Sequence, residues 1–360
     1  MQTQHKLYSD FNELPEGYLQ LLDGTGCHSF DQTLPWYESL CEFVLPQNFR
    51  LRIHGVEDQN SGRAIAVLPV VEKLSAIPLA GSQILPLGNY YTSIYEPILS
   101  SEQNVEKVVA KLGQGLISSS SWFEMDLNPM NKDSLCFDEL IKFFRKAGFY
   151  VQPYFRFGNW YTEIKERSFD EYYLGLPSRL RETLKRKHNK LHKKFDTTVR
   201  IVSSTEGLDE ALADYESVYR KSWKIAEPFP QFIRQISRRF AKDGWLRLGL
   251  IYVDKVPVAA QIWFVKNRTA SIFKLAYDNE YSSYSVGSLL TMALMRHVID
   301  VDQVGIVDYL CGDDDYKKDW MSTRRERWGL RIYRTASLSG FLCAIYQRIC
   351  GVVKKYRSVI

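Results

Sequence analysis

The stretch from Thr269 to Trp320 limits the possible folds of this chain most, because it reads as a strand, a loop, a helix and a second strand in succession. The segment 270–277 is rich in β-branched and aromatic residues, which is typical of a buried strand. Apolar residues then recur at helical spacing over 285–299, and a second apolar run at 304–310 predicts another strand. This order of elements predicts an α/β fold with mixed sheets.

The predicted helix begins with four residues that suit an anion: Ser285, Val286, Gly287 and Ser288. The first turn of a helix has N–H groups without partners inside the helix, and the helix dipole adds positive potential there. A start of this kind directly after a strand predicts a phosphate-binding site. The alternative is an ordinary helix N-terminus capped by its serines.

Length and composition favour two globular domains. A chain of 360 residues is too long for one ordinary core, and 45% hydrophobic with 25% charged residues is typical of a folded protein. The six cysteines are widely spaced without a metal-type pattern, which indicates reduced thiols of a cytoplasmic protein. We see neither an apolar signal segment nor eighteen consecutive apolar residues, and therefore expect a protein that is not exported and does not span a membrane.

A similar order of elements occurs in both halves of the chain. The first half predicts a hairpin, a helix, a strand, a helix ending at Gly148 and two more strands, over 49–54, 64–71, 102–118, 122–127, 137–147, 150–157 and 160–164. The second half predicts two helices, a three-strand meander and then helix, strand, short helix and strand, over 206–223, 230–242, 245–253, 258–265, 270–277, 285–299, 304–310, 315–322 and 328–335. We therefore expect two tandem domains, 1–165 and 166–360. The alternative is one large α/β domain with insertions.

Several short motifs in the second half carry a family resemblance. They are Tyr277-Asp278, the run from Ser285 to Leu290, Asp308-Tyr309-Leu310 with Gly312, Tyr316-Lys317 and Trp320. In this order and spacing they resemble the GNAT-type acetyltransferase domain of bacterial cellulose and exopolysaccharide biosynthesis proteins, which is related to the Fem peptidyltransferases. The family commonly has Pro-Gly where this chain has Val286-Gly287. The likeness extends over about 30–335 and implies two tandem GNAT-like domains.

The resemblance implies that acetyl-CoA, or another acyl-CoA, is the co-substrate. The amides of Ser285 to Ser288 would bind its pyrophosphate, and the strand edge at Tyr277 would pair with its pantetheine arm. No metal is expected. His188 and His192 have a zinc-compatible spacing on a helix, but no acidic or cysteine partner accompanies them.

Acyl transfer needs a base for the acceptor and an acid for the departing thiolate. Asp308 is the candidate base, because a lone carboxylate on an apolar strand is costly unless it is paired or used; the alternative is a structural aspartate. Tyr316 stands where the family has its acid. Lys317 would hold an acceptor phosphate or carboxylate, or would pair with the preceding aspartates. Those aspartates, 313–315, are expected to cap the next helix, and Trp320 is expected in the core.

The strongest charge feature is the predicted helix 178–195, which starts at Pro177-Ser178 and is covered with Lys and Arg outside one narrow apolar face. It is either a docked helix with a solvated basic face or a guide for an anionic partner: the phosphates of coenzyme A, a nucleotide-linked sugar, a lipid-linked substrate or tRNA. The resemblance implies that Arg179 and Arg181 reach the active-site cleft. No recognition-helix motif points to DNA.

Two further segments bear on the acceptor. Asn89 and Tyr90, in the aromatic stretch 88–97, either face an acceptor sugar or peptide or pack within the first domain. The segment Ser337–Val353, which is followed by basic residues, is either a closing helix or a helix on an anionic membrane face.

The sequence therefore predicts an acyl-CoA-dependent N- or O-acyltransferase that acts by direct transfer on a cell-envelope or exopolysaccharide precursor. The acceptor would be a small molecule, a glycan or a peptide, and the protein would be cytoplasmic or at the inner face of the membrane. One alternative is a Fem-like aminoacyl-tRNA-dependent transferase, against which the lack of a long coiled-coil insertion argues. Another is a non-catalytic module of a polysaccharide-synthesis assembly.

Overall fold

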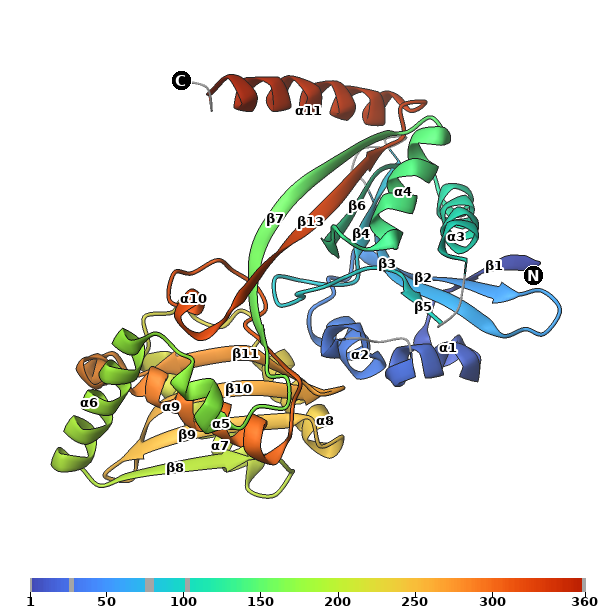
Figure 1. Cartoon of the computed structure of the whole chain (residues 1–360). Helices are drawn as coiled ribbons and strands as arrows, with labels where there is room; N and C mark the ends of the chain where they lie inside the picture. Colours follow the sequence, from blue (N-terminus) through green and yellow to red (C-terminus); the bar gives the residue numbers. More distant parts are fainter. Residues whose placement is uncertain (1, 26–28, 75–80, 101–103, 358–360) are drawn as a thin grey trace. The chain divides into compact units, whose positions relative to one another are not determined.

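The computed structural model describes residues 2–25, 29–74, 81–100 and 104–357, and divides the chain into two compact units (Figure 1). Unit 1 comprises Met1–Phe157 with Glu326–Ile360, and unit 2 comprises Gly158–Arg325. The units differ from the division predicted at residue 165. The C-terminal residues belong to unit 1 because strand β13 (Thr323–Tyr333) pairs with β6 (Trp122–Asn131) of that unit from Arg327 to Tyr333.

Unit 1 is built on a sheet in the order β1-β2-β3-β4-β6-β13. The strands before β6 are β1 (Thr3–Tyr8), β2 (Phe49–Asp58), β3 (Ala64–Leu74) and β4 (Ser82–Pro86), with the short β5 (Ile98–Leu99) on β3. The β4–β6 pair is parallel and the other pairs are antiparallel, so the sheet is mixed. The β2–β3 pairing confirms the predicted hairpin.

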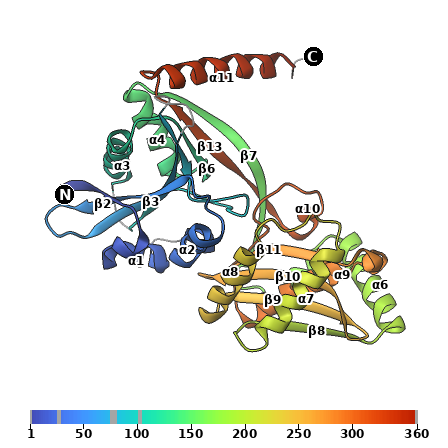
Figure 2. The same cartoon turned by 180° about the vertical axis from the view of Figure 1, so that it is seen from behind.

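Helices cover both faces of the unit 1 sheet (Figure 2). They are α1 (Glu16–Gln20) and α2 (Leu34–Phe43) on one face, α3 (Val105–Ser119) and α4 (Leu135–Lys146) on the other, and α11 (Leu338–Arg357) after β13. The apolar positions of α3 recur at helical spacing, and four of them are fully buried against the sheet: Val108, Val109, Leu112 and Leu116. Helix α4 ends before Gly148, which takes a positive φ of 86° as a helix-terminating glycine does.

Unit 2 contains the order β7-β12-β11-β10-β9-β8, to which β7 (Tyr150–Glu163) contributes its last residues. The other strands are β8 (Thr197–Val202), β9 (Leu246–Val253), β10 (Val256–Lys266), β11 (Thr269–Tyr277) and β12 (Ile306–Asp308). The β11–β12 pair is parallel and the rest are antiparallel. The predicted meander is confirmed. The two strands predicted over 150–164 are one strand, β7, and β8 was not predicted.

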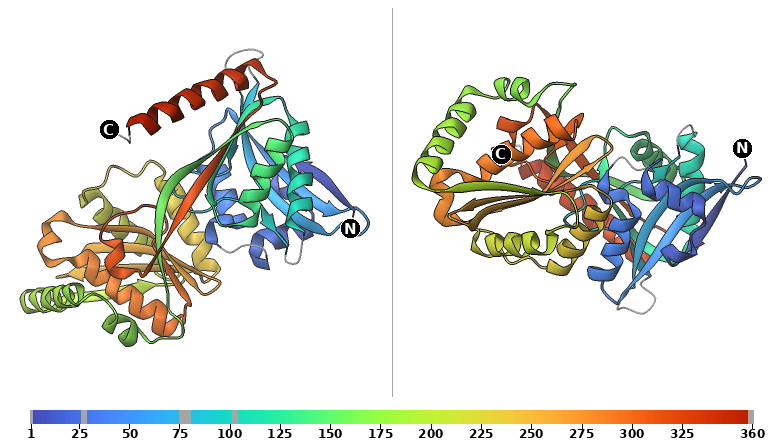
Figure 3. Two further views of the ribbon diagram at one scale, coloured as in Figure 1. Left: turned by 45° about the horizontal axis from the view of Figure 1, so that its top comes forward. Right: turned by 90° about the horizontal axis from the view of Figure 1, so that it is seen from below.

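The helices of unit 2 lie on two sides of its sheet (Figure 3). One side carries α5 (Phe169–Leu174), α6 (Ser178–Lys194) and α9 (Val286–Arg296), and the other carries α7 (Leu208–Lys221) and α8 (Pro230–Lys242); the short α10 (Lys317–Trp320) follows β12. Three of the periodic residues that predict α9 are buried in the core: Leu289, Leu290 and Leu294. Helix α9 packs so closely on β9 that a Cβ on Gly249 of β9 would lie 2.9 Å from Leu294 of α9.

Candidate active site

Strands β11 and β12 separate after a short parallel ladder. The ladder ends at the pair Ser271–Asp308, and the next residue, Tyr309, bonds through its N–H to the Trp160 carbonyl at 2.9 Å instead. Leu310 then takes a left-handed conformation with φ 54°, which turns the chain away. Strand β11 continues to Tyr277 without β12 beside it, so its backbone edge is open for a ligand to pair with.

A cavity of about 340 Å³ lies where the two strands separate. Its walls come from β11, from the segment after β12 and from the loop after α7: Ile272, Phe273, Leu275, Tyr309, Cys311, Asp314, Tyr316, Lys317, Trp223 and Lys224. The cavity therefore combines apolar side chains from β11 with polar groups from the two loops, and small-molecule sites use groups of both kinds.

Asp308, the predicted base, is buried and held by three partners. One carboxylate oxygen accepts from Asn159 Nδ2 at 2.6 Å and from the Leu310 N–H at 2.7 Å, and the other lies 2.5 Å from Arg325 Nη2. These contacts fix the left-handed turn at Leu310 and thereby the separation of the strands. The geometry gives Asp308 a positioning role, and its role as a base stays a prediction.

Tyr316 lines the cavity and lies edge-on to Tyr309, with ring centroids 5.7 Å apart. Its side chain is partly exposed, so a bound molecule can reach it. Burial, with a smaller contribution from Asp314, raises the pKa of Tyr316 above its usual value. The hydroxyl therefore keeps its proton at neutral pH and can donate it.

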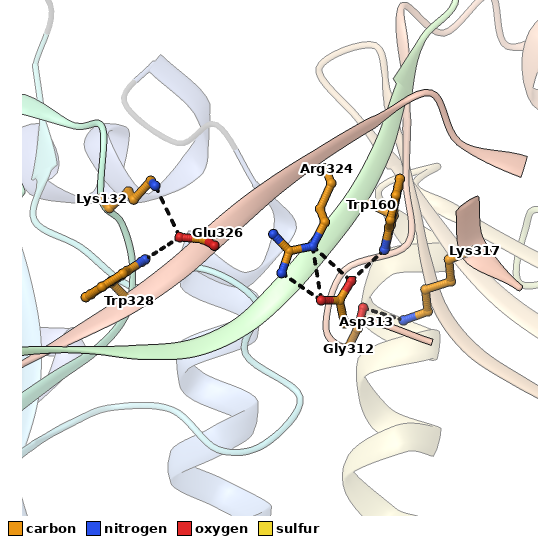
Figure 4. A network of polar contacts seen from close by, with 8 residues as sticks. All are labelled: Lys132, Trp160, Gly312, Asp313, Lys317, Arg324, Glu326 and Trp328. Atoms are coloured by element: carbon orange, nitrogen blue, oxygen red, sulfur yellow. Dashed lines mark hydrogen bonds and ion pairs between the residues drawn. The ribbon is translucent and has the colours of Figure 1, made fainter. Parts of the chain in front are cut away.

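Lys317 is buried, and contacts within the chain engage its ammonium group. Nζ donates to the Gly312 carbonyl at 3.1 Å (Figure 4). It also donates to the Cys311 carbonyl at 2.5 Å and lies 3.2 Å from an Asp314 carboxylate oxygen. An ammonium has three N–H donors, so these partners engage all of them. Of the two interpretations of Lys317, the pairing with an aspartate is confirmed, and acceptor binding stays a prediction.

The prediction that the aspartates 313–315 cap α10 is wrong. The N-cap is Tyr316, without a side-chain cap bond. Asp313 instead accepts three bonds from Arg324 and one from Trp160 Nε1 at 2.7 Å, because its loop passes beside β7 and β13 (Figure 4). Asp315 pairs with Lys318 on the surface. Trp320 is in the core, as predicted.

The start of α9 has the geometry that anion binding requires. Ser285 precedes it in the left-handed region, with φ 55° and ψ 39°, and makes no side-chain cap bond, so the alternative of a serine cap is wrong for this residue. The first helical bond runs from Leu289 N to the Ser285 carbonyl, which leaves the N–H groups of Val286, Gly287 and Ser288 without helical partners. The first turn has no acidic residue that would repel an anion. The residues therefore fit a pyrophosphate.

Tyr277 and Gly287 join the open strand edge to the helix start. A Cβ on Gly287 would lie 2.9 Å from the Tyr277 ring, so glycine is what permits this close approach. The Gly287 carbonyl accepts from Gln261 Nε2 at 2.9 Å, and Gln261 is buried on β10. We did not predict a role for Gln261, for which the only signal is an amide inside an apolar strand.

The basic helix α6 lies along the loop before α9. Lys187 Nζ donates to the Ser283 carbonyl at 2.5 Å, Lys194 Nζ to the Tyr284 hydroxyl at 3.2 Å, and Lys190 Nζ lies 4.6 Å from the centre of the Tyr284 ring. Among the described residues, no ion pair joins α6, which has eight Lys and Arg and one Glu, to an acid. The positive charge beside the helix start is therefore largely uncompensated.

The two predicted arginines of α6 lie at the other end of that helix. Arg179 is exposed, and Arg181 Nε donates to the Leu176 carbonyl at 3.2 Å. Leu176 lines a different cavity, of about 750 Å³, together with Pro177 and 318–323. The structure thus brings the lysines near the C-terminus of α6 to the α9 loop, and substrate binding by Arg179 and Arg181 stays a prediction.

Asn89 and Tyr90 belong to unit 1, whereas the other predicted site residues belong to unit 2. Asn89 Oδ1 accepts from the Tyr91 N–H at 2.9 Å, and the Tyr90 side chain is exposed. The segment is anchored by the buried Asp31, which accepts from the Ser93 N–H at 2.6 Å. Acceptor binding by Asn89 and Tyr90 stays a prediction.

Lys224 is a site residue that the sequence did not reveal. It lines the 340 Å³ cavity and also a second cavity of about 550 Å³ between α7 and α8. Burial, together with the positive charges of Lys274 and Lys317, lowers the pKa of Lys224 to about 8. In the sequence Lys224 is an ordinary lysine in a loop. Its lowered pKa arises only from the groups that surround it in the folded protein.

Comparison with known proteins agrees with this geometry. Residues 178–318 match the family model described as an acetyltransferase (GNAT) domain. FemX has 11% identity and a TM-score of 0.61, covering 91% of this chain and 97% of its own. A tandem GNAT protein from the clavulanic acid biosynthesis pathway has 11% identity and a TM-score of 0.51, covering 91% and 98%. The C-terminal domain of a putative lysylphosphatidylglycerol synthetase from Agrobacterium fabrum has 11% identity and a TM-score of 0.52, covering 92% and 94%. No curated protein matches.

Residues 178–318 are therefore similar to a GNAT acetyltransferase domain, and the α/β fold with mixed sheets is similar to that of a tandem GNAT protein. Within the described residues, there is no group of three or more His, Cys, Asp or Glu side chains arranged to hold a metal ion.

Proposed function

We propose that this protein is an acyl-CoA-dependent N- or O-acyltransferase, with acetyl-CoA as the first candidate donor and a cell-envelope or exopolysaccharide precursor as acceptor. One observation supports this most. Inside the segment that matches the GNAT model, the open edge of β11 leads from the cavity at Ile272 to Tyr277, and Tyr277 lies against Gly287 at the uncapped start of α9. A thioester, a pantetheine arm and a pyrophosphate, in this order, would suit these three places.

The residues that would hold the donor follow from their chemistry. The amides of Val286, Gly287 and Ser288 would bind the pyrophosphate, and the positive charge of Lys187 and its neighbours on α6 would add to the attraction. The free backbone groups of β11 would pair with the amides of the pantetheine arm. Acyl-CoA itself supplies the activated thioester.

The proposed acid is Tyr316, which keeps its proton at neutral pH and lines the cavity. Two groups are candidates for accepting the proton that the acceptor loses. Both oxygens of Asp308 already accept hydrogen bonds, whereas Lys224 has a pKa of about 8 and is substantially neutral near that pH. We therefore propose Lys224 as the base and Asp308 as the residue that positions the turn at Leu310.

The basic surface of α6 supports aminoacyl-tRNA as an alternative donor. Its eight Lys and Arg residues have no acidic partner among the described residues, and such a surface would also attract an RNA backbone. The Fem-type transferases that the sequence resembles use this donor.

A thermal-shift titration of the whole chain distinguishes the two donors. We expect acetyl-CoA to raise the melting temperature, since a ligand at a hundred times its Kd adds about 2.7 kcal/mol of stability. A series of longer acyl-CoAs would then define the acyl group. Stabilisation by aminoacyl-tRNA without any response to acyl-CoA would favour the alternative donor. No response to any acyl-CoA would contradict the proposal.

A further inference from the structure

Helix α11 has an exposed apolar stripe. Its large apolar side chains are between 39% and 75% exposed and recur every three or four residues along one face: Leu338, Phe341, Leu342, Ile345, Tyr346 and Ile349. Single exposed apolar residues are common on proteins, but a continuous stripe of six marks a surface that binds something.

On the opposite face of α11, two small residues pack on unit 1. Gly340 is buried, and a Cβ there would lie 2.9 Å from the Phe123 carbonyl and still closer to that of Arg334. Ala344, one turn further, is also buried. The helix therefore places its small side chains against the protein and its large apolar ones outward, which is the reverse of a helix that faces water. In Figure 1 it extends from the end of β13 away from the strands of unit 1.

The sequence of α11 and of the residues around it carries charge of one sign. From residue 335 to residue 360 the sequence has four basic residues and no Asp or Glu: Arg348, Lys354, Lys355 and Arg357. A second copy of the chain packed on the same face would bring two such segments together, and they would repel each other. An anionic surface would be attracted.

We infer that α11 binds the surface of an anionic lipid bilayer, with its apolar stripe among the acyl chains and its basic residues at the headgroups. The 20 residues of the helix would lie in the plane of the interface. No helix in the described part of the chain is long and apolar enough to cross a membrane. This inference is independent of the donor and would bring the enzyme to acceptors that are themselves anchored in a membrane.

Co-sedimentation of the whole chain with lipid vesicles tests this inference. We expect binding to vesicles of phosphatidylcholine mixed with phosphatidylglycerol, and at least about tenfold weaker binding to phosphatidylcholine alone, since each basic residue adds roughly fivefold. Phe341→Ser with Leu342→Ser should weaken binding to the anionic vesicles by about tenfold or more, because about 0.8 kcal/mol is lost for each buried methylene. Both residues are exposed, so the melting temperature should not change.

Val199→Ser is the matched control, because Val199 is an exposed apolar residue on β8 of unit 2, and it should leave vesicle binding unchanged. Equal binding to neutral and anionic vesicles, or unchanged binding of the Phe341/Leu342 variant, would overturn the inference. So would a concentration-dependent dimer that the same variant abolishes without lipid, because the stripe would then bind a second copy of the chain.

Discussion

Among the described residues, each unit contains one parallel strand pair joined through a helix, and the two helices begin differently. In unit 1, α3 lies between β4 and β6 and comes after the short β5. Asn104 caps α3 by accepting from the Lys107 N–H at 3.0 Å, and Glu106 is in the first turn. In unit 2, α9 follows β11 and starts at Ser285 with neither a side-chain cap nor an acidic residue. The first helix supplies its own anionic partner, and the second leaves that place to a ligand.

The returning strands differ in the same way. β6 has ten residues and continues beside β13 after its three parallel pairs with β4. β12 has only three residues, which pair with β11 and β7 before the chain turns away at Leu310. The two units thus share an order of elements, and unit 2 departs from regular pairing where its cavity lies. The comparison teaches that the site arises where strand pairing and helix capping are left incomplete.

The largest expected effect is that of Lys224→Met on turnover. If Lys224 is the base, kcat falls by about 10²–10³-fold, which is within the usual range for such groups. In the wild-type enzyme kcat/KM should rise as Lys224 loses its proton, with a midpoint near pH 8, and the variant should lack this rise. A pH–rate profile of both proteins measures it. If Asp308→Asn removes the rise and Lys224→Met does not, Asp308 is the base instead.

The lowered pKa of Lys224 also predicts how the stability of the protein changes with pH. Its pKa is lower in the folded protein than in the unfolded chain, so between about pH 8 and 10.5 the unfolded chain binds more protons. The free energy of unfolding should therefore receive a contribution from Lys224 that increases with pH across that window. Urea unfolding at pH 7.5 and pH 10 should show this increase in the wild type, and the increase should be smaller in Lys224→Met.

Tyr316→Phe should lower kcat by about 10²-fold, because the thiolate loses its proton donor. The phenyl ring keeps its edge-on packing with Tyr309, so acyl-CoA binding should be unchanged. Steady-state kinetics with a binding titration separates the two effects. Tyr90→Phe, an exposed tyrosine of unit 1, tests at the same time whether the acceptor needs that unit. Full activity of Tyr316→Phe would remove Tyr316 as the acid.

Gly287→Ala should weaken acyl-CoA binding by about tenfold, because its Cβ would push the Tyr277 ring away, and a misplacement of this kind is costly. Gly305→Ala is the matched control, since a Cβ there meets nothing nearer than 3.8 Å. Calorimetric titration of both variants measures the effect. Equal affinities of the two variants for acyl-CoA would show that the start of α9 is not part of the donor site.

The smallest effect is expected at the start of α3. Asn104→Ala removes a side-chain cap and should cost about 1 kcal/mol of stability. Acyl-CoA affinity and turnover should stay at the wild-type level, because this helix start is already satisfied. A change in either value without a loss of stability would contradict the assignment of the site to unit 2 alone.

Local patterns were enough to predict much of the fold. The bounds of α6, α8 and α9 follow from apolar periodicity and from Pro177 and Pro230 at the helix starts, and the structure confirms them to within a few residues. The single strand β7 was predicted as two strands, before and after Gly158 and Asn159. These two residues lie within β7, beside Asp313 and Asp308.

The chemistry of the site was harder to predict, because it depends on partners that are distant in the sequence. Asp308 could be selected as unusual, but its partners Asn159 and Arg325 stand 149 and 17 residues away, and they decide what its carboxylate can do. Lys224 has no local signal at all, since its lowered pKa arises from burial and from two other lysines.

Amide hydrogen exchange with and without saturating acetyl-CoA tests the central comparison most directly, because it reports on both helix starts in one experiment. We predict that exchange slows at the amides of Val286, Gly287 and Ser288, and that it stays unchanged at the capped start of α3, from Val105 to Lys107. No slowing at the start of α9, or an equal slowing at both helices, would contradict the account.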